Sequence, residues 1–389
     1  MNVPKLRFKE FTDEWKQTPL KNIIYSNIIE APKPTTDYIR LGIRSHCKGT
    51  FHELVKIENI LSADKMYIVP KNNLILNITF AWEQAIAITD DNDEGKYISN
   101  RFPTFAFKDN QLPTFYKYII PQKRLKYDLN VASPGGAGRN RVLNKKLFLS
   151  IPVNIPLLKE QEKIAKFLTT VDKKITNLEN TITSLENQKK GLLQQIFSQK
   201  LRFKDKNGNN YPNWEKKKLE DISNITMGQS PDSDFVNNEK IGTPFLQGNA
   251  EFTNKYPIEK YWCTKPQKIA NSTDILLSVR APVGAINIAN KEFCIGRGLS
   301  AISFNCNKLF GKYNLEFNLF QLIKKSQGST FSSINKKDIS EIILFIPCLE
   351  EQTKIADFLS AFDRKLENQK AQLEHWKQIK KGLLQQMFV

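Results

Sequence analysis

The sequence is poor in the residues that form disulfides and zinc sites. Its 389 residues include five cysteines and three histidines, and no two cysteines form a Cys-x-x-Cys pair. This argues against a disulfide scaffold and against a zinc site with Cys and His ligands, so we expect no bound metal. No run of about 18 apolar residues occurs, and the opening MNVPKLRFKEF lacks the apolar segment of a signal peptide. We therefore expect a soluble, cytoplasmic protein that does not enter a membrane.

Acidic residues are scarce relative to basic ones. Lys and Arg number 58 and Asp and Glu 40, which gives a formal net charge of +18. Such an excess suggests a polyanionic partner such as nucleic acid. Aromatic residues are plentiful, because 25 Phe, 11 Tyr and 5 Trp occur in a chain that is 40% hydrophobic. This composition excludes a globally disordered protein. At about 150 residues per domain, the length predicts two to three domains.

Known catalytic motifs are missing as well. The sequence has no Gly-x-x-x-x-Gly-Lys-Ser/Thr loop that would bind ATP. It also has no Asn-Pro-Pro-Tyr stretch of the kind that amino-methyltransferases use, and residues 210–213 (NYPN) differ from it. Asp232 and Asp234 lack the nearby Glu-x-Lys partner of a nuclease centre, so a solvated loop is the better interpretation. The sequence therefore points away from an enzyme.

What the sequence does contain is an internal duplication. Residues 156–175 (PLLKEQEKIAKFLTTVDKKI) return as residues 347–366 (PCLEEQTKIADFLSAFDRKL), and residues 191–197 (GLLQQIF) return as residues 382–388 (GLLQQMF). Both pairs are offset by 191 positions, and the ungapped match of 42 positions that begins at Pro156 has 20 identities. A match of this extent indicates duplication.

Each copy carries a heptad seam. Apolar residues from Ile164 to Leu185 alternate in spacings of four and three, Lys189 takes one seam position, and the second copy repeats the spacing from Ile355 to Leu383. A period of 3.5 predicts two long helices that pair as a coiled coil, although an ordinary helical bundle shows similar stripes. A compact domain of about 145 residues is about 38 Å wide. It could not join the ends of parallel helices about 57 Å long, so we expect antiparallel pairing.

A second repeat lies at the start of each half. Lys5–Lys9 (KLRFK) recurs as Lys200–Lys204, and each copy is followed by a tryptophan, Trp15 or Trp214. Because the first GLLQQ repeat leads almost directly into KLRFK, joining the two termini would recreate the central junction. We therefore predict that the KLRF near the N-terminus packs against the end of the C-terminal helix.

The segments between the duplicated helices differ in sequence but share a pattern. Both read as short alternating strands with turns, and each ends in a glycine- or serine-rich loop followed by Asn-Lys-Lys. We expect an α+β fold, with two domains of mixed strands and helices separated by a long antiparallel coiled-coil pair and related by a pseudo-twofold axis. The expected boundaries are 1–150 and 199–345 for the two domains, and 151–198 and 346–389 for the two helical spacers.

These residues resemble the specificity subunit of type I restriction–modification systems. The resemblance rests on the repeated pattern Pro…Leu…Glu-Gln…Lys-Ile-Ala…Phe-Leu…Asp, then Lys-Gly-Leu-Leu-Gln-Gln, and covers nearly the whole chain. The second domain adds motifs similar to those recurrent in that family: Gly228–Pro231, Pro244–Gly248, Ser278–Gly284 and Gly296–Leu299. The first domain departs from them, since Asn77–Ala81 (NITFA) stands where an Arg-Ala-Pro stretch would be.

The resemblance implies a non-catalytic scaffold for double-stranded DNA. Each variable segment would be a target-recognition domain that reads one half of a split, asymmetric site. The helices would set the spacing and dock two methyltransferase subunits, which methylate adenine N6 with S-adenosylmethionine. A motor–nuclease restriction subunit would complete the complex, so that ATP and Mg also belong to partners and this chain binds no cofactor. Two alternatives remain: a stand-alone DNA-acting enzyme with an unrecognised site, and a coiled-coil adaptor that binds only protein.

Candidate contacts follow from the chemistry of base and phosphate recognition. Arg suits guanine and Asn or Gln suits adenine, whereas Lys suits phosphates. In the second domain we expect base contacts from Gln247, Asn249, Arg280 and Arg297. In the first domain the expected equivalents are Arg44, Lys48, Arg101, Arg139 and Arg141. Phosphate contacts are expected from Lys145, Lys146, Lys336 and Lys337. The surface that docks partner subunits is expected at the repeated helix ends, from Leu192, Leu193, Gln194, Gln195, Leu383, Leu384, Gln385 and Gln386.

Overall fold

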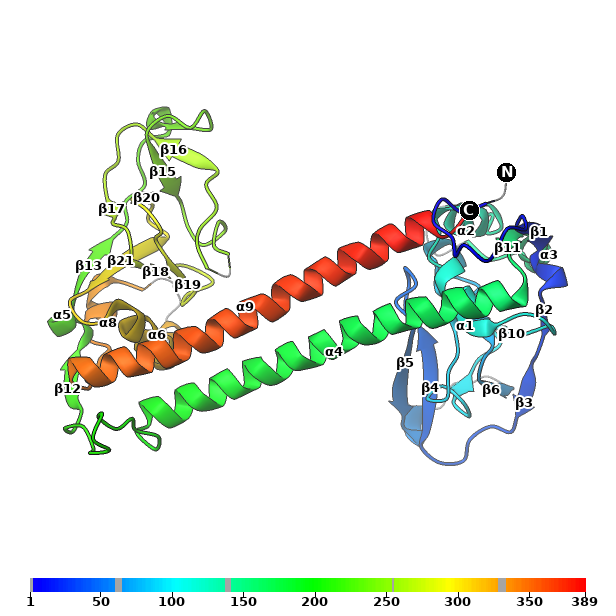
Figure 1. Ribbon diagram of the computed structural model, residues 1–389, viewed down its shortest axis with the longest axis horizontal. Helices are drawn as coiled ribbons and strands as arrows, with labels where there is room; N and C mark the ends of the chain where they lie inside the picture. The colour runs from blue at the N-terminus through cyan, green and yellow to red at the C-terminus, as the bar shows by residue number, and fades with distance from the viewer. Residues whose placement is uncertain (1–2, 60–64, 137–140, 254, 328–333) are drawn as a thin grey trace. The chain divides into compact units, whose positions relative to one another are not determined.

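The chain forms two compact units. The computed structural model describes residues 3–59, 65–136, 141–253, 255–327 and 334–389 (Figure 1). The first unit consists of Met1–Glu179 and Gln372–Val389, and the second of Asn180–Ala371. Each unit therefore holds one variable segment together with parts of both duplicated segments. Among the described residues, no helix is long and apolar enough to cross a membrane.

The first unit is built on two sheets. One has four strands in the order β2-β10-β7-β8, the other has five in the order β3-β6-β9-β4-β5, and β1 pairs with β11. The strands are β1 (Lys16–Pro19), β2 (Ile24–Ser26), β3 (Ile29–Ala31), β4 (Tyr38–Ile43), β5 (Thr50–Val55), β6 (Met66–Ile68), β7 (Leu74–Leu76), β8 (Ile86–Ile88), β9 (Tyr97–Ile98), β10 (Thr104–Phe107) and β11 (Pro152–Ile155). The shorter helices are α1 (Pro113–Ile119), α2 (Lys123–Val131) and α3 (Lys145–Ser150). This mixture confirms the expected α+β class.

The second unit repeats the arrangement. Its four-stranded sheet has the order β13-β21-β18-β19, its five-stranded sheet the order β14-β16-β15-β20-β17, and β12 pairs with β22. The strands are β12 (Glu215–Lys218), β13 (Ser223–Met227), β14 (Val236–Asn237), β15 (Thr243–Leu246), β16 (Tyr261–Cys263), β17 (Ile269–Ala270), β18 (Ile275–Ser278), β19 (Ile286–Ile288), β20 (Phe293–Ile295), β21 (Leu299–Phe304) and β22 (Ile343–Ile346). The shorter helices are α5 (Leu219–Ile222), α6 (Lys308–Asn318), α7 (Phe320–Gln327) and α8 (Lys336–Ser340).

The two variable segments share most of their topology despite their different sequences. In the four-stranded sheets, Leu74 lies opposite Ile88 and, at the same place, Ile275 lies opposite Ile288. The five-stranded sheets share an antiparallel hairpin, β4-β5 or β15-β16, beside a parallel neighbour, β9 or β20. They differ at the edge, because β3 pairs with β6 in the first unit and β14 pairs with β16 in the second. The internal repeat therefore includes the variable segments as well as the helices.

The duplicated segments form two long helices, α4 (Leu158–Phe197) and α9 (Leu349–Gln386). Side chains at the seam positions of both helices, from Ile164 to Leu185 and from Ile355 to Leu383, are buried or half-buried. Repeated apolar spacing at a period of 3.5 keeps one stripe of each helix covered along its length. The seam expected from the sequence is thus confirmed.

Ion pairs between the helices show that they run antiparallel in each unit. In the first unit, Asp172 pairs with Lys380 at 2.6 Å, and further along α4 Glu179 pairs with Lys377, earlier in α9, at 2.8 Å. The second unit shows the same order in the pairs Glu186–Lys370 and Lys189–Asp363, at 2.7 and 2.6 Å. The two helices therefore lie side by side with opposite directions (Figure 1). This confirms the direction expected from the reach of the intervening domain.

The KLRF near the N-terminus packs at the end of α9, as the duplication predicts. The amide of Leu6 donates a hydrogen bond to the carbonyl oxygen of Gln386 at 2.9 Å. At the central junction, the amide of Leu201 donates to the carbonyl oxygen of Gln195 at 3.0 Å. The chain ends thus meet in the same way as the continuous chain does at its centre.

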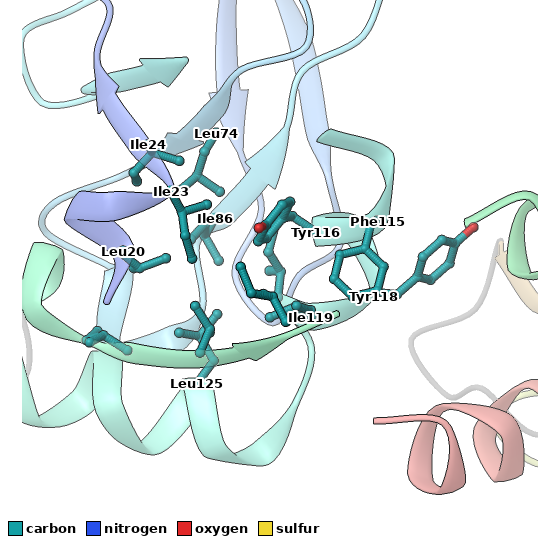
Figure 2. Close-up of a cluster of buried hydrophobic side chains, with 14 of the residues drawn as sticks. Leu20, Ile23, Ile24, Leu74, Ile86, Phe115, Tyr116, Tyr118, Ile119 and Leu125 are labelled. Atoms are coloured by element: carbon teal, nitrogen blue, oxygen red, sulfur yellow. The ribbon is translucent and has the colours of Figure 1, made fainter. Parts of the chain in front are cut away.

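Each unit has a main hydrophobic core to which both long helices contribute. Figure 2 shows part of the first core, where Leu74 of β7 packs among side chains of β2, β8 and α1. Ile164 near the start of α4 and Met387 just after α9 belong to the same core. In the second core the roles are exchanged, because the end of α4 supplies Phe197 and the start of α9 supplies Ile355. Each variable segment is therefore fixed to one helix start and one helix end.

Candidate DNA interface

The four motifs of the second domain, far apart in sequence, meet at one place. Gly228 donates its amide to the carbonyl oxygen of Leu299 at 2.9 Å, and Gly298 donates to that of Gln247 at 3.2 Å. The amide of Val279 in turn donates to the carbonyl oxygen of Gly298 at 2.9 Å. The motifs thus form one cluster of turns at the ends of β13, β15, β18 and β20, which we call the motif cluster.

Two glycines allow the turns of the motif cluster to approach so closely. A Cβ atom on Gly228 would lie 2.2 Å from the carbonyl oxygen of Gly296. One on Gly298 would lie 2.6 Å from the carbonyl oxygen of Gln247. Both distances are shorter than any ordinary contact of a Cβ atom, so only glycine fits at these positions. The glycines therefore set the positions of the polar side chains beside them.

Three polar side chains of the motif cluster are exposed. Gln247 donates through Nε2 to Oγ of Ser230 at 3.1 Å, and the amide of Arg297 donates to the same oxygen at 3.3 Å. Arg280 and Arg297 have exposed side chains, and within the described residues neither guanidinium has a hydrogen bond or an ion pair. Both are free to contact a polyanion. Sequence reasoning gave no role to Ser230, although it lies in the motif Gly228–Pro231.

In the first domain, Arg44 and Lys48 lie on the hairpin between β4 and β5. The Arg44 guanidinium donates to the carbonyl oxygen of Thr50 and lies over the ring of Phe51, 5.0 Å from its centroid. Lys48 is exposed at the turn itself. The orientation of Arg44 is therefore fixed by its own hairpin, whereas Lys48 has an exposed side chain.

Arg141 is half-buried and makes its hydrogen bonds within the domain. Its Nε donates to the carbonyl oxygen of Ser133 at 3.1 Å, and its Nη2 donates to that of Asn130 at 2.8 Å. The guanidinium also lies over the ring of Trp82, 5.1 Å from its centroid. Carbonyl groups at the C-terminal end of a helix, here α2, are favourable partners for a cation. Arg141 thus stabilises the domain, and its contact with DNA stays a prediction.

The remaining base-contact candidates lie in different surroundings. Arg101 is exposed on the turn after β9 and has no ion pair within the described residues. Asn249 is half-buried, and its carbonyl oxygen accepts the amide of Phe252 at 3.1 Å, so it begins a turn shortly after β15. Arg139 lies outside the described residues.

The two lysine pairs occupy equivalent places in the two units. Asn144 caps the start of α3, and Asn335 caps the start of α8, in each case by accepting backbone amides with its side-chain oxygen. Directly after these caps come the exposed side chains of Lys145, Lys146, Lys336 and Lys337. Lysines that are 191 positions apart in the sequence therefore occupy equivalent places in the two units.

The repeated helix ends are partly covered by the chain itself. Leu193 packs against the main core of the second unit, and Leu383 and Leu384 pack against that of the first. Leu192 is half-buried as well. The glutamines that follow are exposed in both copies: Gln194, Gln195, Gln385 and Gln386. Both helix ends thus present the same short polar surface.

The two domains differ at a position that their backbones share. Thr79 stands in the first domain where Arg280 stands in the second. The residue before each, Ile78 or Val279, donates its amide to the turn that follows β9 or β20, at 3.0 and 2.9 Å. Asn77–Ala81 therefore does stand where the second domain has its Arg-Ala-Pro stretch. The first domain has Thr79 there and lacks the guanidinium of Arg280.

Two half-buried thiols, those of Cys47 and Cys306, lie in surroundings that raise their pKa. Burial raises the pKa of the Cys47 thiol to about 12 and that of Cys306 to about 11, so both stay protonated near neutral pH. Within the residues that the structure describes, no three His, Cys, Asp or Glu side chains are grouped to hold a metal ion.

The sequence matches one family model twice and is similar to proteins that share one description. The sequence model described as "Type I restriction modification DNA specificity domain" matches residues 17–187 and again 211–375. The chain is 37% identical over 408 residues to a protein of Methanocaldococcus jannaschii named for the MjaX specificity subunit of a type I restriction enzyme, covering 98% of this chain and 95% of that one. It is 24% identical to the MjaVIII specificity subunit of the same organism, covering 91% and 84%.

Solved structures show the same fold. One, from a study of complex assembly and conformational transition of the type I R-M system, has a TM-score of 0.59 at 24% identity and covers 95% of this chain and 96% of its own. The S subunit of a type I restriction–modification system from M. genitalium has a TM-score of 0.63 at 15% identity and covers 100% and 99%. The likeness thus extends over both units.

Proposed function

We propose that this chain, which belongs to the type I restriction modification DNA specificity family, reads a DNA site made of two different halves. Within such a system it is the specificity subunit. The observation that carries this proposal is that the two units share a topology but differ at equivalent positions, such as the half-buried Thr79 and the exposed Arg280. Two domains of one topology with different contact side chains would read two half-sites of different sequence. The complete site would therefore be asymmetric.

We propose that the exposed side chains of the motif cluster contact bases. Arg280 and Arg297 would each donate hydrogen bonds to a guanine, since a guanidinium can donate to guanine O6 and N7 together, and Gln247 suits adenine. In the first domain Arg44, Lys48 and Arg101 are the corresponding proposals. The exposed lysines after the α3 and α8 caps would hold phosphates, which fix the register of each domain on the duplex without reading sequence.

The duplicated helices would set the distance between half-sites and dock the partners. Residues 151–198 and 346–389 form the proposed spacers, between target-recognition domains at 1–150 and 199–345. Two methyltransferase subunits would dock at the two helix ends, because Gln194 and Gln195 recur as the equally exposed Gln385 and Gln386. Two copies of one surface would accept two copies of one partner. A motor–nuclease restriction subunit would join this complex.

The chemistry would belong to the partners. We propose that the modification subunits bind S-adenosylmethionine and methylate adenine N6, that the restriction subunit uses ATP and Mg, and that this chain itself is non-catalytic. The complex would act in the cytoplasm, where the DNA of a bacterial or archaeal cell is found.

The test is reconstitution with and without partners. The purified chain is titrated with a duplex library at about 50 and 200 mM salt, where phosphate contacts should make affinity fall steeply with salt. With modification subunits and S-adenosylmethionine added, methylation should map to one bipartite sequence. Methyl transfer or cleavage by the chain alone would contradict the proposal and favour a stand-alone enzyme. Binding to protein partners without any affinity for DNA would favour a coiled-coil adaptor that binds only protein.

A further inference from the structure

The turn after β9 and the turn after β20 have the same backbone. In the first domain, Phe102 donates its amide to the carbonyl oxygen of Ser99 at 3.1 Å. In the second, Leu299 donates to the carbonyl oxygen of Gly296 at 3.0 Å. Both are four-residue turns closed by a bond between their first and fourth residues. The second residue of each turn is Asn100 in the first domain and Arg297 in the second.

Two further features place these turns at the same point of the fold. The third residue of each, Arg101 or Gly298, accepts through its carbonyl oxygen the amide that follows β7 or β18, as described above. The strand after each turn, β10 or β21, then pairs with the equivalent strand β7 or β18. Asn100 and Arg297 are therefore counterparts, although no sequence motif connects them.

Both side chains are available for contact. Asn100 is exposed, as Arg297 is, and neither side chain has a hydrogen bond or ion pair within the described residues. An exposed residue at this position is unconstrained by packing, so its identity can vary without cost to the fold. The backbone that presents it, in contrast, is fixed by the bonds above.

Arg101 is not the counterpart of Arg297. It occupies the position of Gly298, where in the second domain a Cβ atom would lie 2.6 Å from the carbonyl oxygen of Gln247. A side chain at this position is therefore an addition specific to the first domain. Asn100 is the residue that corresponds to Arg297, so an amide in the first domain takes the place of that guanidinium.

We infer that Asn100 and Arg297 are the equivalent specificity-determining residues of the two domains, with Asn100 selecting adenine and Arg297 selecting guanine at the corresponding position of each half-site. The side-chain amide of asparagine can bond N6 and N7 of adenine together, as arginine bonds O6 and N7 of guanine. This inference rests on the proposed function, because it assumes that both turns face the major groove of a bound duplex.

The experiment uses the full chain with its modification subunits, S-adenosylmethionine and a duplex library randomised at both half-sites. Asn100→Ala should relax one base position of one half-site, and Arg297→Ala one position of the other, with discrimination falling about tenfold or more. Asn100→Arg should change the preferred base at its position from adenine to guanine, and Arg297→Asn should make the reverse change. Thermal unfolding midpoints of all four variants should equal that of the unchanged chain, since both residues are exposed.

A matched control separates position from residue type. Asn92→Ala removes another exposed amide of the first domain, on the turn between β8 and β9, and should leave every base preference unchanged. If the Asn100 variants lower methylation equally on all sequences, or leave the preferences unaltered, the inference is wrong while the proposed function stands. If the complex that contains the unchanged chain methylates the library without sequence preference, the proposed function fails and the inference with it.

Discussion

At the scale of single residues, one buried carboxylate holds the start of each half of the chain. Glu160 and Glu351 are 2% and 0% exposed. Arg7 bonds Glu160 and Arg202 bonds Glu351, each at 2.8 Å, and a tryptophan indole also donates to each carboxylate. These contacts explain why KLRF and the following tryptophan recur together: the arginine, the tryptophan and the helical glutamate form one buried unit.

Removing the charge of this carboxylate should destabilise the protein. We expect Glu351→Gln to lower the free energy of unfolding by about 3 kcal/mol, because it leaves Arg202 without its counter-ion in a mostly buried place. Denaturant titration measures the loss. Glu350→Gln, the exposed neighbour in the same helical turn, is the matched control and should change stability by about 0.5 kcal/mol or less. Equal effects of the two variants would contradict the assignment.

The pH dependence of this contact follows from the pKa of the arginine. The hydrogen bond and charge of Glu351 raise the pKa of Arg202 above its ordinary value. A raised pKa in the folded state contributes stability below the unfolded value and loses it only as pH rises through the folded value. Titration of Arg202 should therefore leave stability unchanged between about pH 6 and pH 9.

At the scale of elements, the lysine in each seam joins the two helices to a variable domain. Asp363 of α9 accepts the Tyr313 hydroxyl of α6 at 2.7 Å and pairs with Lys189 of α4 at 2.6 Å. Burial and the nearby Asp363 raise the pKa of Tyr313, so its hydroxyl stays a donor. The first unit repeats the arrangement with Tyr118, Asp172 and Lys380. A polar residue at a seam position that finds one partner fixes the register of the pair.

A double-mutant cycle should measure this registration. We expect a coupling energy of about 1–2 kcal/mol between Lys189→Met and Asp363→Asn, since their side chains are only 20% and 25% exposed. The control cycle uses Lys370 and Glu186, a pair on the same two helices with side chains 39% and 49% exposed, and should give about 0.5 kcal/mol or less. A coupling no larger than in the control would show that the seam lysine carries no special role.

The sequence predicts those parts of the fold in which the same buried residues occur in both copies of the duplication. The seam, the helix direction and the meeting of the termini all follow from duplicated residues, because buried spacing is the same in both copies. Lys189 interrupts the apolar seam, and the sequence alone does not explain why, because its partner Asp363 is far away in the sequence. The contacts of Arg141 with the carbonyl oxygens of Asn130 and Ser133, at and just after the end of α2, cannot be recognised from any local sequence pattern. The equivalence of Asn100 and Arg297 is invisible for a different reason: exposed turn residues carry no packing signal.

At the scale of the whole molecule, modular recognition has a direct consequence. Replacing residues 1–150 with the corresponding segment of another family member should change one half-site and leave the other unchanged, because each variable segment has its own core and its own contact turns. Methylation mapping in cells that also hold the modification subunit checks this. The reciprocal replacement of 199–345 is the control. A change in both half-sites after either replacement would contradict independent reading.

The last prediction concerns the distance between half-sites. α4 and α9 both run from one unit into the other, so inserting seven residues in each, after Asn187 and after Glu367, lengthens both spacers by one heptad. A whole heptad keeps the seam in phase, so the helices should still pair. Each helix grows by about 10 Å, which corresponds to about 3 base pairs at roughly 3.4 Å each. The same 3 base pairs turn the groove by about 100°, at about 10.5 per turn.

Because length and groove direction change together, the lengthened chain should bind DNA more weakly, and any methylation that survives should fall on sites with the original half-sites and an altered spacer. The control inserts the heptad in α4 alone, which shifts one seam against the other and should lower the unfolding midpoint instead. Methylation mapping distinguishes the outcomes. Full methylation at the original spacer would show that the paired helices do not measure the distance between the two halves of the site, and that another part of the complex sets it.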